Sequence, residues 1–155
     1  MIHWESKLQS WCEKIGASHA GLARLQTPLT WDYYKNWLDA GHGADMNYLA
    51  NHAAFKKDPH KWRPDFFSAI VVAFPYLPHP QGPSPFAASR TALYSQGADY
   101  HHWVKSQMQI MIEELQGLYP NETFEVHTDS IPLMERDLAY RAGLGWFGKN
   151  TWLIH

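Results

Sequence analysis

Residues 128–150 read TDSIPLMERDLAYRAGLGWFGKN and join an acidic residue, a helical segment and a glycine-rich loop. Just ahead of the aspartate, Phe124, Val126 and Thr128 alternate with polar neighbours, which predicts a strand ending at Thr128. Asp129 would then follow the carboxyl end of a strand, the place where open α/β sheets bind their ligands. The stretch therefore predicts a functional site.

A short helix and a glycine-rich loop complete this stretch. Pro132 suits the first turn of a helix and Gly143 suits its end. Residues 143–148 match the pattern G-x-G-x-x-G, but a dinucleotide-binding fingerprint needs its glycines between a strand and a following helix. Here the glycines follow a helix and lead into residues 151–154, which are typical of a strand. A near match to the P-loop fails for the same reason, and Asn150 replaces its hydroxyl residue.

Composition predicts a single globular domain. The chain has 155 residues, of which 45% are hydrophobic and 18% charged, and its net charge of -2 gives no general attraction to nucleic acid or acidic membranes. Cys12 is the only cysteine, so the chain can form no internal disulfide and cannot supply four thiolates to an iron–sulfur cluster. Without an apolar run of about 18 residues or a signal-peptide core, we expect a soluble, cytoplasmic protein.

Hydrophobic periodicity predicts most of the remaining elements. We expect helices over residues 4–15, 31–38, 45–52 and 100–118 and strands over residues 20–25 and 68–76. The second strand is nearly all apolar, which predicts a central strand buried on both faces. Five of the ten prolines lie between residues 75 and 85, and they predict a stiff, extended loop. We expect this loop to form a wall of a binding cleft, and a linker between domains is the alternative.

Two polar residues are expected to cap helices. Thr30 precedes the second helix and Asp99 precedes the long one. For Asp99, a capping role and a catalytic role both remain open. Cys12 falls on the apolar stripe of the first helix and is interpreted as a core residue.

Ten histidines make a metal site worth testing. His127 and Asp129 would share one face of a strand, but the chain has no His-x-x-x-His pair on a helix face and no cysteine pair. We therefore expect no metal ligands. A serine hydrolase is also disfavoured, because Ser130 lacks the flanking glycines of a nucleophile elbow.

Asp129 is the candidate general acid. A free aspartic acid has a pKa of about 3.9, so it needs a desolvated position or a neighbouring carboxylate to deliver a proton at neutral pH. The alternative is that Asp129 caps the helix that starts near Pro132. Spacing alone does not decide between these two roles.

Five motifs carry a family resemblance. Residues 129–151 hold D-S-x-P-x-x-E-R and A-G-L-G-W-x-G-K-N-T, and shorter matches are W-L-x-A-G-x-G-x-x-M-x-Y-L at 37–49, K-D-P at 57–59 and Y-x-x-G-x-D-Y-H at 94–101. Together they closely resemble the epoxyqueuosine reductases, cobalamin-dependent enzymes that complete the queuosine base in tRNA. The apolar strand near residue 70 occupies the place of the family's central strand.

The resemblance implies a fold and a set of site residues. The fold would be α+β, a mixed, largely antiparallel sheet with helices on both faces, forming a nitroreductase-like cobalamin-binding domain over residues 1–155. Asp129 matches the family's proton donor and Asp99 a second acid of the site. The residues expected to contact cobalamin are Tyr100, His101, Ser130, Arg136, Gly143, Gly145, Gly148, Lys149 and Asn150. The glycines would let the backbone approach the corrin ring.

Two departures bear on activity. Ala98 stands where the family usually has arginine, and Leu93 replaces a commonly basic residue, which weakens the expectation of phosphate or tRNA contacts there. The family also continues beyond the position of His155 into a domain with two 4Fe–4S clusters. With one cysteine, this chain is expected to be a fragment or a shortened relative with another electron source. Two alternatives stay open, a non-catalytic corrinoid-binding module and a flavin-binding nitroreductase-like domain.

Overall fold

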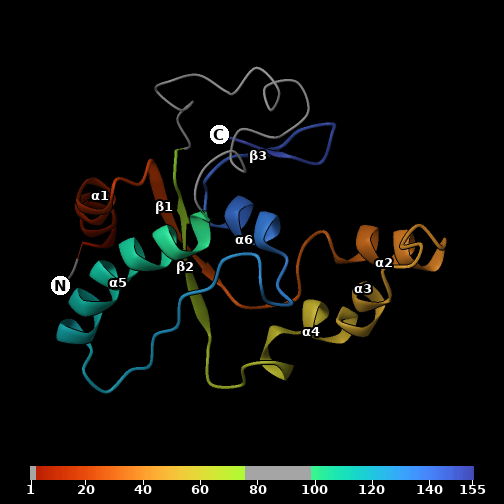
Figure 1. The fold of residues 1–155 in the computed structure, drawn as a ribbon, viewed down its shortest axis with the longest axis horizontal. Coiled ribbons are helices and arrows are strands. Elements are labelled where there is room, and N and C mark those ends of the chain that lie inside the picture. The colour runs from red at the N-terminus through yellow and green to blue at the C-terminus, as the bar shows by residue number, and fades with distance from the viewer. Residues whose placement is uncertain (1–2, 76–98) are drawn as a thin grey trace. The chain divides into compact units, whose positions relative to one another are not determined.

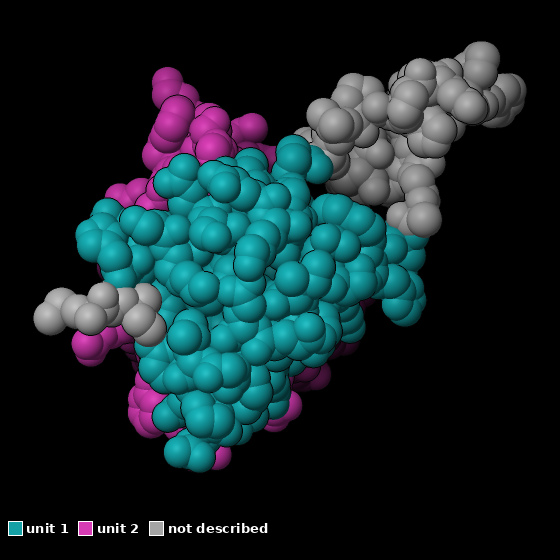
Figure 2. Space-filling view, turned by 90° about the vertical axis from the view of Figure 1, so that its left-hand side faces the viewer, with its two compact units in different colours: residues 1–18, 73–128 teal, residues 19–72, 129–155 magenta. Residues whose placement is uncertain are grey.

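The computed structural model describes residues 3–75 and 99–155, and the chain divides into two compact units. Unit 1 comprises Met1–Ser18 and Ala73–Thr128, and unit 2 comprises His19–Val72 and Asp129–His155. Figure 1 shows the order of the elements along the chain, and Figure 2 colours unit 1 teal and unit 2 magenta. The proline-rich stretch beyond Pro75 lies outside the described residues.

Two packed helices form the core of unit 1. They are α1 (Trp4–Ile15) and α5 (Tyr100–Leu118), and both agree with the predicted ranges. Trp11, Ile15 and Met111 are fully buried where the apolar stripes meet. Each such side chain contributes about 1.5–3 kcal/mol when it leaves water. Gly16 ends α1 in the left-handed conformation, with φ of 68°.

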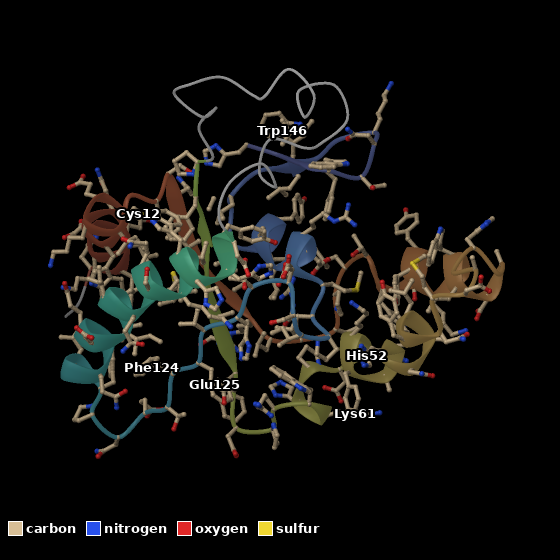
Figure 3. The ribbon with its side chains drawn as sticks, in the orientation of Figure 1. Cys12, His52, Lys61, Phe124, Glu125 and Trp146 are labelled. Atoms are coloured by element: carbon tan, nitrogen blue, oxygen red, sulfur yellow. The ribbon has the colours of Figure 1, made fainter. Side chains whose placement is uncertain are left out.

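One carboxylate lies at the centre of the polar contacts between these helices. Glu114 on α5 accepts hydrogen bonds from Lys7 Nζ and Trp11 Nε1, each at 2.8 Å, and also pairs with Lys14. These donors lower the pKa of Glu114 to about 2, with the Lys14 contact as the largest cause. Cys12 on α1, labelled in Figure 3, is buried, as predicted, and desolvation raises the pKa of its thiol.

The predicted strand that ends at Thr128 is wrong. Phe124, Val126 and Thr128 are half-buried and alternate with the exposed Glu125 and His127, but no strand is formed there among the described residues (Figure 3). The alternation correctly indicates alternating burial along this segment. A strand also needs a neighbouring strand to complete its hydrogen-bond ladder, and a sequence pattern carries no information about that neighbour.

A small sheet and α6 (Glu135–Arg141) form the core of unit 2. Strands β1 (His19–Arg24) and β2 (Ser68–Ala73) pair, and β1 contacts α6. The hydrogen bonds at the two ends of the pair, Ser18 N–H to Ala73 O and Leu25 N–H to Phe67 O, follow antiparallel order. β2 was predicted in the right place, but it is not buried on both faces: Ser68 is exposed, the other five residues are half-buried, and its sheet has two strands in the described part of the chain.

Close packing of β1 on α6 depends on a glycine. A Cβ added at Gly21 would lie 2.0 Å from the carbonyl oxygen of Ala142. The apolar cluster around this contact contains Ala23, Leu25 and Leu138. Sequence reasoning did not identify Gly21, because its reason is a close approach to a residue far along the chain.

Short helices follow β1 along the chain. They are α2 (Trp31–Asp39), α3 (Asn47–Asn51), α4 (Ala53–Lys57) and the 3₁₀ turn η1 (Pro59–Lys61). The first two agree with the predicted helices. Thr30 occupies the predicted N-cap position of α2, but its side chain makes no cap hydrogen bond.

The last part of unit 2 is a helix followed by a hairpin. The predicted helix begins at Glu135, three residues after Pro132. Beyond Gly143, β3 (Trp146–Phe147) pairs antiparallel with β4 (Leu153–Ile154), so a strand follows the glycines, as predicted. The predicted α+β class is confirmed as a mixture of helices and small sheets. In the described ranges, no helix has the length and apolar character needed to cross a membrane.

Candidate functional site

The predicted site residues fall into two groups, one in each unit. Asp99, Tyr100 and His101 belong to unit 1, and all the others from Asp129 to Asn150 belong to unit 2. Each group is therefore described by its own geometry.

The group in unit 1 surrounds the first turn of α5. Asp99 Oδ1 accepts a hydrogen bond from the His101 backbone N–H at 2.9 Å and lies 2.6 Å from His101 Nδ1. The rings of Tyr100 and His101 stack with centroids 4.2 Å apart. The His101 backbone N–H, followed by its side chain, lowers the pKa of Asp99. The predicted capping role of Asp99 is confirmed, and in this arrangement its carboxylate accepts hydrogen bonds in the ionised form.

Asp129 opens the group in unit 2 with an unusual backbone conformation. Its side chain is exposed and its φ is +38°, in the region that non-glycine residues rarely adopt. Its backbone N–H donates a hydrogen bond to Glu135 Oε1 at 2.7 Å. The alternative prediction that Asp129 caps the helix is wrong, since Met134 occupies the N-cap position without a side-chain cap. Instead, Glu135 in the first turn of α6 accepts the hydrogen bond from the Asp129 backbone N–H.

Arg136 connects α6 to the hairpin. Its Nη1 donates to the Thr151 carbonyl oxygen at 2.7 Å and lies 3.3 Å from Thr151 Oγ1. Thr151 also has a positive φ of 65°. Ser130, next to Asp129, is exposed. The loop, the helix and the hairpin of the signature stretch are thus linked by side-chain contacts within one unit.

The glycines of the loop have different structural reasons. Gly143 ends α6 with φ of 79°, and a Cβ added there would meet nothing within 4 Å. At Gly145, an added Cβ would lie 2.1 Å from the Ile154 carbonyl oxygen, and at Gly148 it would lie 2.7 Å from Ile154 Cδ1. Packing against β4 therefore explains two of the three glycines.

The end of the hairpin is exposed. Lys149 and Asn150 lie there, and Asn150 Oδ1 accepts a hydrogen bond from the Trp152 N–H at 3.3 Å. Trp146 and Trp152 expose 58% and 63% of their surface, and Figure 3 labels the first of them on β3. Sequence reasoning did not identify these two tryptophans as surface residues, because no sequence signal separates them from core tryptophans.

Sequence reasoning also missed a buried carboxylate. Asp137 exposes 1% of its surface and accepts hydrogen bonds from the Thr30 backbone N–H at 3.1 Å and from the Thr30 hydroxyl at 3.2 Å. Arg141 Nε donates to its other oxygen at 2.7 Å, and Arg141 Nη1 donates to the Arg24 carbonyl oxygen at 2.6 Å. The spacing of four residues between Asp137 and Arg141 was the available signal. Within the described ranges, no three histidine, cysteine or acidic side chains form a group that could hold a metal ion.

Comparisons with known sequences point to one family. The family described as Epoxyqueuosine reductase QueG, DUF1730, matches residues 56–130. The epoxyqueuosine reductase of Pseudomonas aeruginosa is 27% identical over 152 residues, which is 96% of this chain and 42% of that protein. The epoxyqueuosine reductase of Cyclobacterium marinum is 34% identical over 148 residues, which is 92% of this chain and 46% of that protein. The resemblance inferred from the motifs is confirmed, and the chain spans less than half the length of these two relatives.

Solved structures share the fold. An epoxyqueuosine reductase from Streptococcus thermophilus has a TM-score of 0.76 at 22% identity and covers 99% of this chain and 42% of its own. Another, bound to an epoxyqueuosine-modified tRNA stem loop, has a TM-score of 0.68 at 19% identity and covers 97% of this chain and 40% of its own. That from Bacillus subtilis, with its catalytic aspartate loop swung out of the active site, has a TM-score of 0.67 at 19% identity and covers 98% of this chain and 41% of its own.

Proposed function

Because this chain is homologous to the epoxyqueuosine reductases, of which it spans about two fifths, we propose that it forms the cobalamin-binding part of such an enzyme. The reaction would reduce epoxyqueuosine to queuosine in tRNA, and a tRNA substrate implies a cytoplasmic location. The observation that carries the proposal is that the similarity extends over 96% of the chain in the Pseudomonas relative. That extent includes the signature stretch around Asp129.

Asp129 is the proposed proton donor. Conversion of an epoxide to an alkene takes two electrons and two protons and releases the oxygen as water, so an acid is needed at the departing oxygen. The exposure of Asp129 and its positive φ support a role at a loop position, since strained backbone conformations cluster at functional sites. In the solved epoxyqueuosine reductase from Bacillus subtilis, a catalytic loop that contains an aspartate is swung out of the active site.

Asp99 would be the second acid by resemblance. Its carboxylate is engaged by His101 and its pKa is lowered, so its proposed part is to accept and orient a hydrogen bond during the reaction. The proton itself would come from Asp129.

The described residues are compatible with cobalamin. All nine residues expected to contact the corrin are exposed or half-buried, so none of them is committed to the core. In unit 2, the exposed rings of Trp146 and Trp152 offer the apolar surface that a flat macrocycle requires. The Thr128 hydroxyl, directly before Asp129, is buried without a hydrogen-bond partner in the described part of the chain, as expected where a bound group or water completes the site. When bound, cobalamin would supply the electrons for breaking the carbon–oxygen bond.

Two structural details belong to the same proposal. The fold would be nitroreductase-like, and residues 1–155 would act together as one cobalamin-binding domain. Electrons would reach the cofactor from 4Fe–4S clusters on the iron–sulfur domain of the family or from an external reductant, because Cys12 is the only cysteine in this sequence.

Cofactor binding is tested by mixing the protein with cobalamin and, separately, with flavin mononucleotide, followed by gel filtration and absorption spectra. The proposal expects cobalamin to remain with the protein. Retention of flavin alone would favour the nitroreductase-like alternative, and retention of neither would reject the proposal. Addition of a chemical reductant and tRNA bearing epoxyqueuosine then separates an enzyme from a corrinoid-binding module.

The role of Asp129 is tested with Asp129→Asn. This variant should retain cobalamin and lose turnover by roughly 10²- to 10⁴-fold, the usual contribution of a general acid. Asp45→Asn, which changes another exposed aspartate of unit 2, is the matched control and should keep normal turnover. Full turnover in Asp129→Asn would remove this residue as the proton donor.

A further inference from the structure

Residues 56–63 form a strongly basic segment in unit 2. They read KKDPHKWR, so four of the eight residues are lysine or arginine and one is acidic, in a chain whose net charge is -2. We call residues 56–63 the basic segment. It comprises the end of α4, the turn η1 and the two residues that follow. Figure 3 labels Lys61 in this part of the chain.

Asp58, the one acidic residue of the basic segment, forms a hydrogen bond with the backbone. Asp58 Oδ1 accepts a hydrogen bond from the His60 N–H at 3.2 Å and caps η1, whose first residue, Pro59, is buried. Asp58 therefore holds the turn in shape. Its carboxylate forms no ion pair with the segment's lysines among the described residues.

The four cations differ in how far the fold restrains them. Lys56 is half-buried, with Nζ 3.5 Å from the Leu133 carbonyl oxygen and 5.7 Å from the centroid of the Tyr34 ring. Desolvation lowers the pKa of Lys56, while nearby Glu135 opposes this shift. Lys56 thus belongs to the packing of unit 2, and it is not counted as a ligand-binding group.

The other three cations lie at or near the surface, and two of them lie beside aromatic rings. Lys57 Nζ lies 5.8 Å from the centroid of Trp31, and the Arg63 guanidinium lies 4.3 Å from that of Trp62. Lys61 is exposed. Within the described ranges, neither Lys57 nor Lys61 forms a salt bridge, so binding an anion would not require breaking one.

Aromatic surface accompanies this charge. Phe67 is 70% exposed, and its ring contacts the His60 ring at a centroid distance of 5.5 Å. Cations that reach phosphates, together with aromatic rings on which unpaired bases stack, are typical of surfaces that bind single-stranded or looped nucleic acid. An anionic membrane surface is disfavoured, because interfacial binding uses a long amphipathic helix and α4 has five residues.

We propose that the basic segment binds RNA, with Lys57, Lys61 and Arg63 contacting phosphates and the neighbouring rings contacting bases. This inference rests on the proposed function, which supplies an RNA substrate. It adds a location for RNA contacts on this chain. At Ala98 and Leu93 this chain lacks the basic residues that the family usually has, and the basic segment supplies cations in a different part of the sequence.

The test measures binding of a fluorescent, unmodified RNA stem–loop by anisotropy across a series of salt concentrations. The double variant Lys57→Gln/Lys61→Gln should weaken binding on the order of tenfold for every stem–loop sequence and reduce the slope of log K against log salt by about two, one per lost phosphate contact. Lys35→Gln is the matched control, because Lys35 is an exposed lysine of unit 2 that pairs with Asp39. It should leave affinity and slope near the wild-type values.

Three outcomes would overturn the inference. They are unchanged RNA binding in the double variant, an equal loss in Lys35→Gln, and lysine-dependent binding to phosphatidylserine vesicles without binding to RNA. Circular dichroism and thermal unfolding of each variant establish that the fold is intact. Cobalamin retention, measured on the same samples, reports on the proposed function separately, so failure of either one is distinguishable from failure of the other.

Discussion

The Asp129 backbone N–H donates a hydrogen bond to the Glu135 carboxylate at 2.7 Å, and this contact joins the loop of the proposed proton donor to the first turn of α6. The bond restrains a residue whose φ of +38° is unfavourable for a side chain with a Cβ. Glu135 was not a predicted site residue, although it lies within the signature motif. Glu135 thus restrains the backbone of the loop, while Asp129 itself stays exposed.

Glu135→Ala should loosen the Asp129 loop. Loss of the acceptor should speed hydrogen exchange of the Asp129 amide by roughly tenfold, which corresponds to about 1.4 kcal/mol for one exposed charge-assisted hydrogen bond. Amide exchange measured by NMR checks this prediction. Glu135→Gln retains a carbonyl acceptor and should give an intermediate rate, and identical exchange in all three proteins would show that the bond does not restrain the loop.

Asp137→Ala should be strongly destabilising. The substitution leaves the largely buried Arg141 without its partner, and breaking a buried ion pair from one side costs about 3–5 kcal/mol. Urea unfolding measures the loss. Asp39→Ala is the control, because Asp39 pairs with Lys35 at the same helical spacing in an exposed position, where such pairs contribute about 0–1 kcal/mol. Similar losses in the two variants would contradict the importance of burial at Asp137.

The glycines of the loop should differ in their tolerance of alanine. Gly145→Ala places a Cβ against the Ile154 carbonyl oxygen, so the hairpin must shift, whereas Gly143→Ala meets open space and carries only the left-handed backbone strain of about 1–2 kcal/mol. Thermal unfolding should therefore show the larger loss for Gly145→Ala. Gly117→Ala, near the end of α5 with nothing within 4 Å, should be neutral or slightly stabilising. An equally mild effect at Gly145 would refute the packing argument.

Glu114 should make unit 1 sensitive to acid. Its pKa is about 2 in the folded state and about 4.3 for an ordinary glutamate, so the unfolded chain binds more protons between these values. The stabilisation is therefore fully present above pH 5 and is lost as the pH falls toward 2. Urea unfolding of wild type and Glu114→Gln at several pH values should show a difference that disappears in acid. Glu113→Gln removes the adjacent, exposed carboxylate as a control for net charge, and a pH-independent difference at Glu114 would contradict this prediction.

Local patterns predicted the helices well. The apolar stripes of α1 and α5 match their boundaries, and the predicted roles of Gly16 at the end of α1 and of Asp99 at the start of α5 are confirmed. These features depend on residues within one or two turns of each other, so the sequence contains the relevant interactions. The same reasoning placed a strand after the glycines, which correctly separated this loop from a dinucleotide-binding fingerprint.

The same reasoning failed where an element depends on pairing with a segment that is distant in the sequence. The alternation around Val126 is present as alternating burial, but the segment forms no strand in the described part of the chain. The helix expected from Pro132 begins later, because the intervening residues form the loop whose first N–H bonds to Glu135. For the candidate site, the motifs identified the Asp129 stretch, while the buried Asp137 and the exposed hairpin tryptophans were not found.

By itself, the sequence determined the helical segments, their glycine and aspartate ends, and the family to which the signature stretch is related. The tertiary structure decided which polar groups meet, as in the contact of Thr30 with Asp137, and why Gly145 cannot carry a side chain beside Ile154. The physical reason is range: periodicity and capping act over a few residues, whereas burial and hydrogen-bond partners depend on segments that only folding brings together.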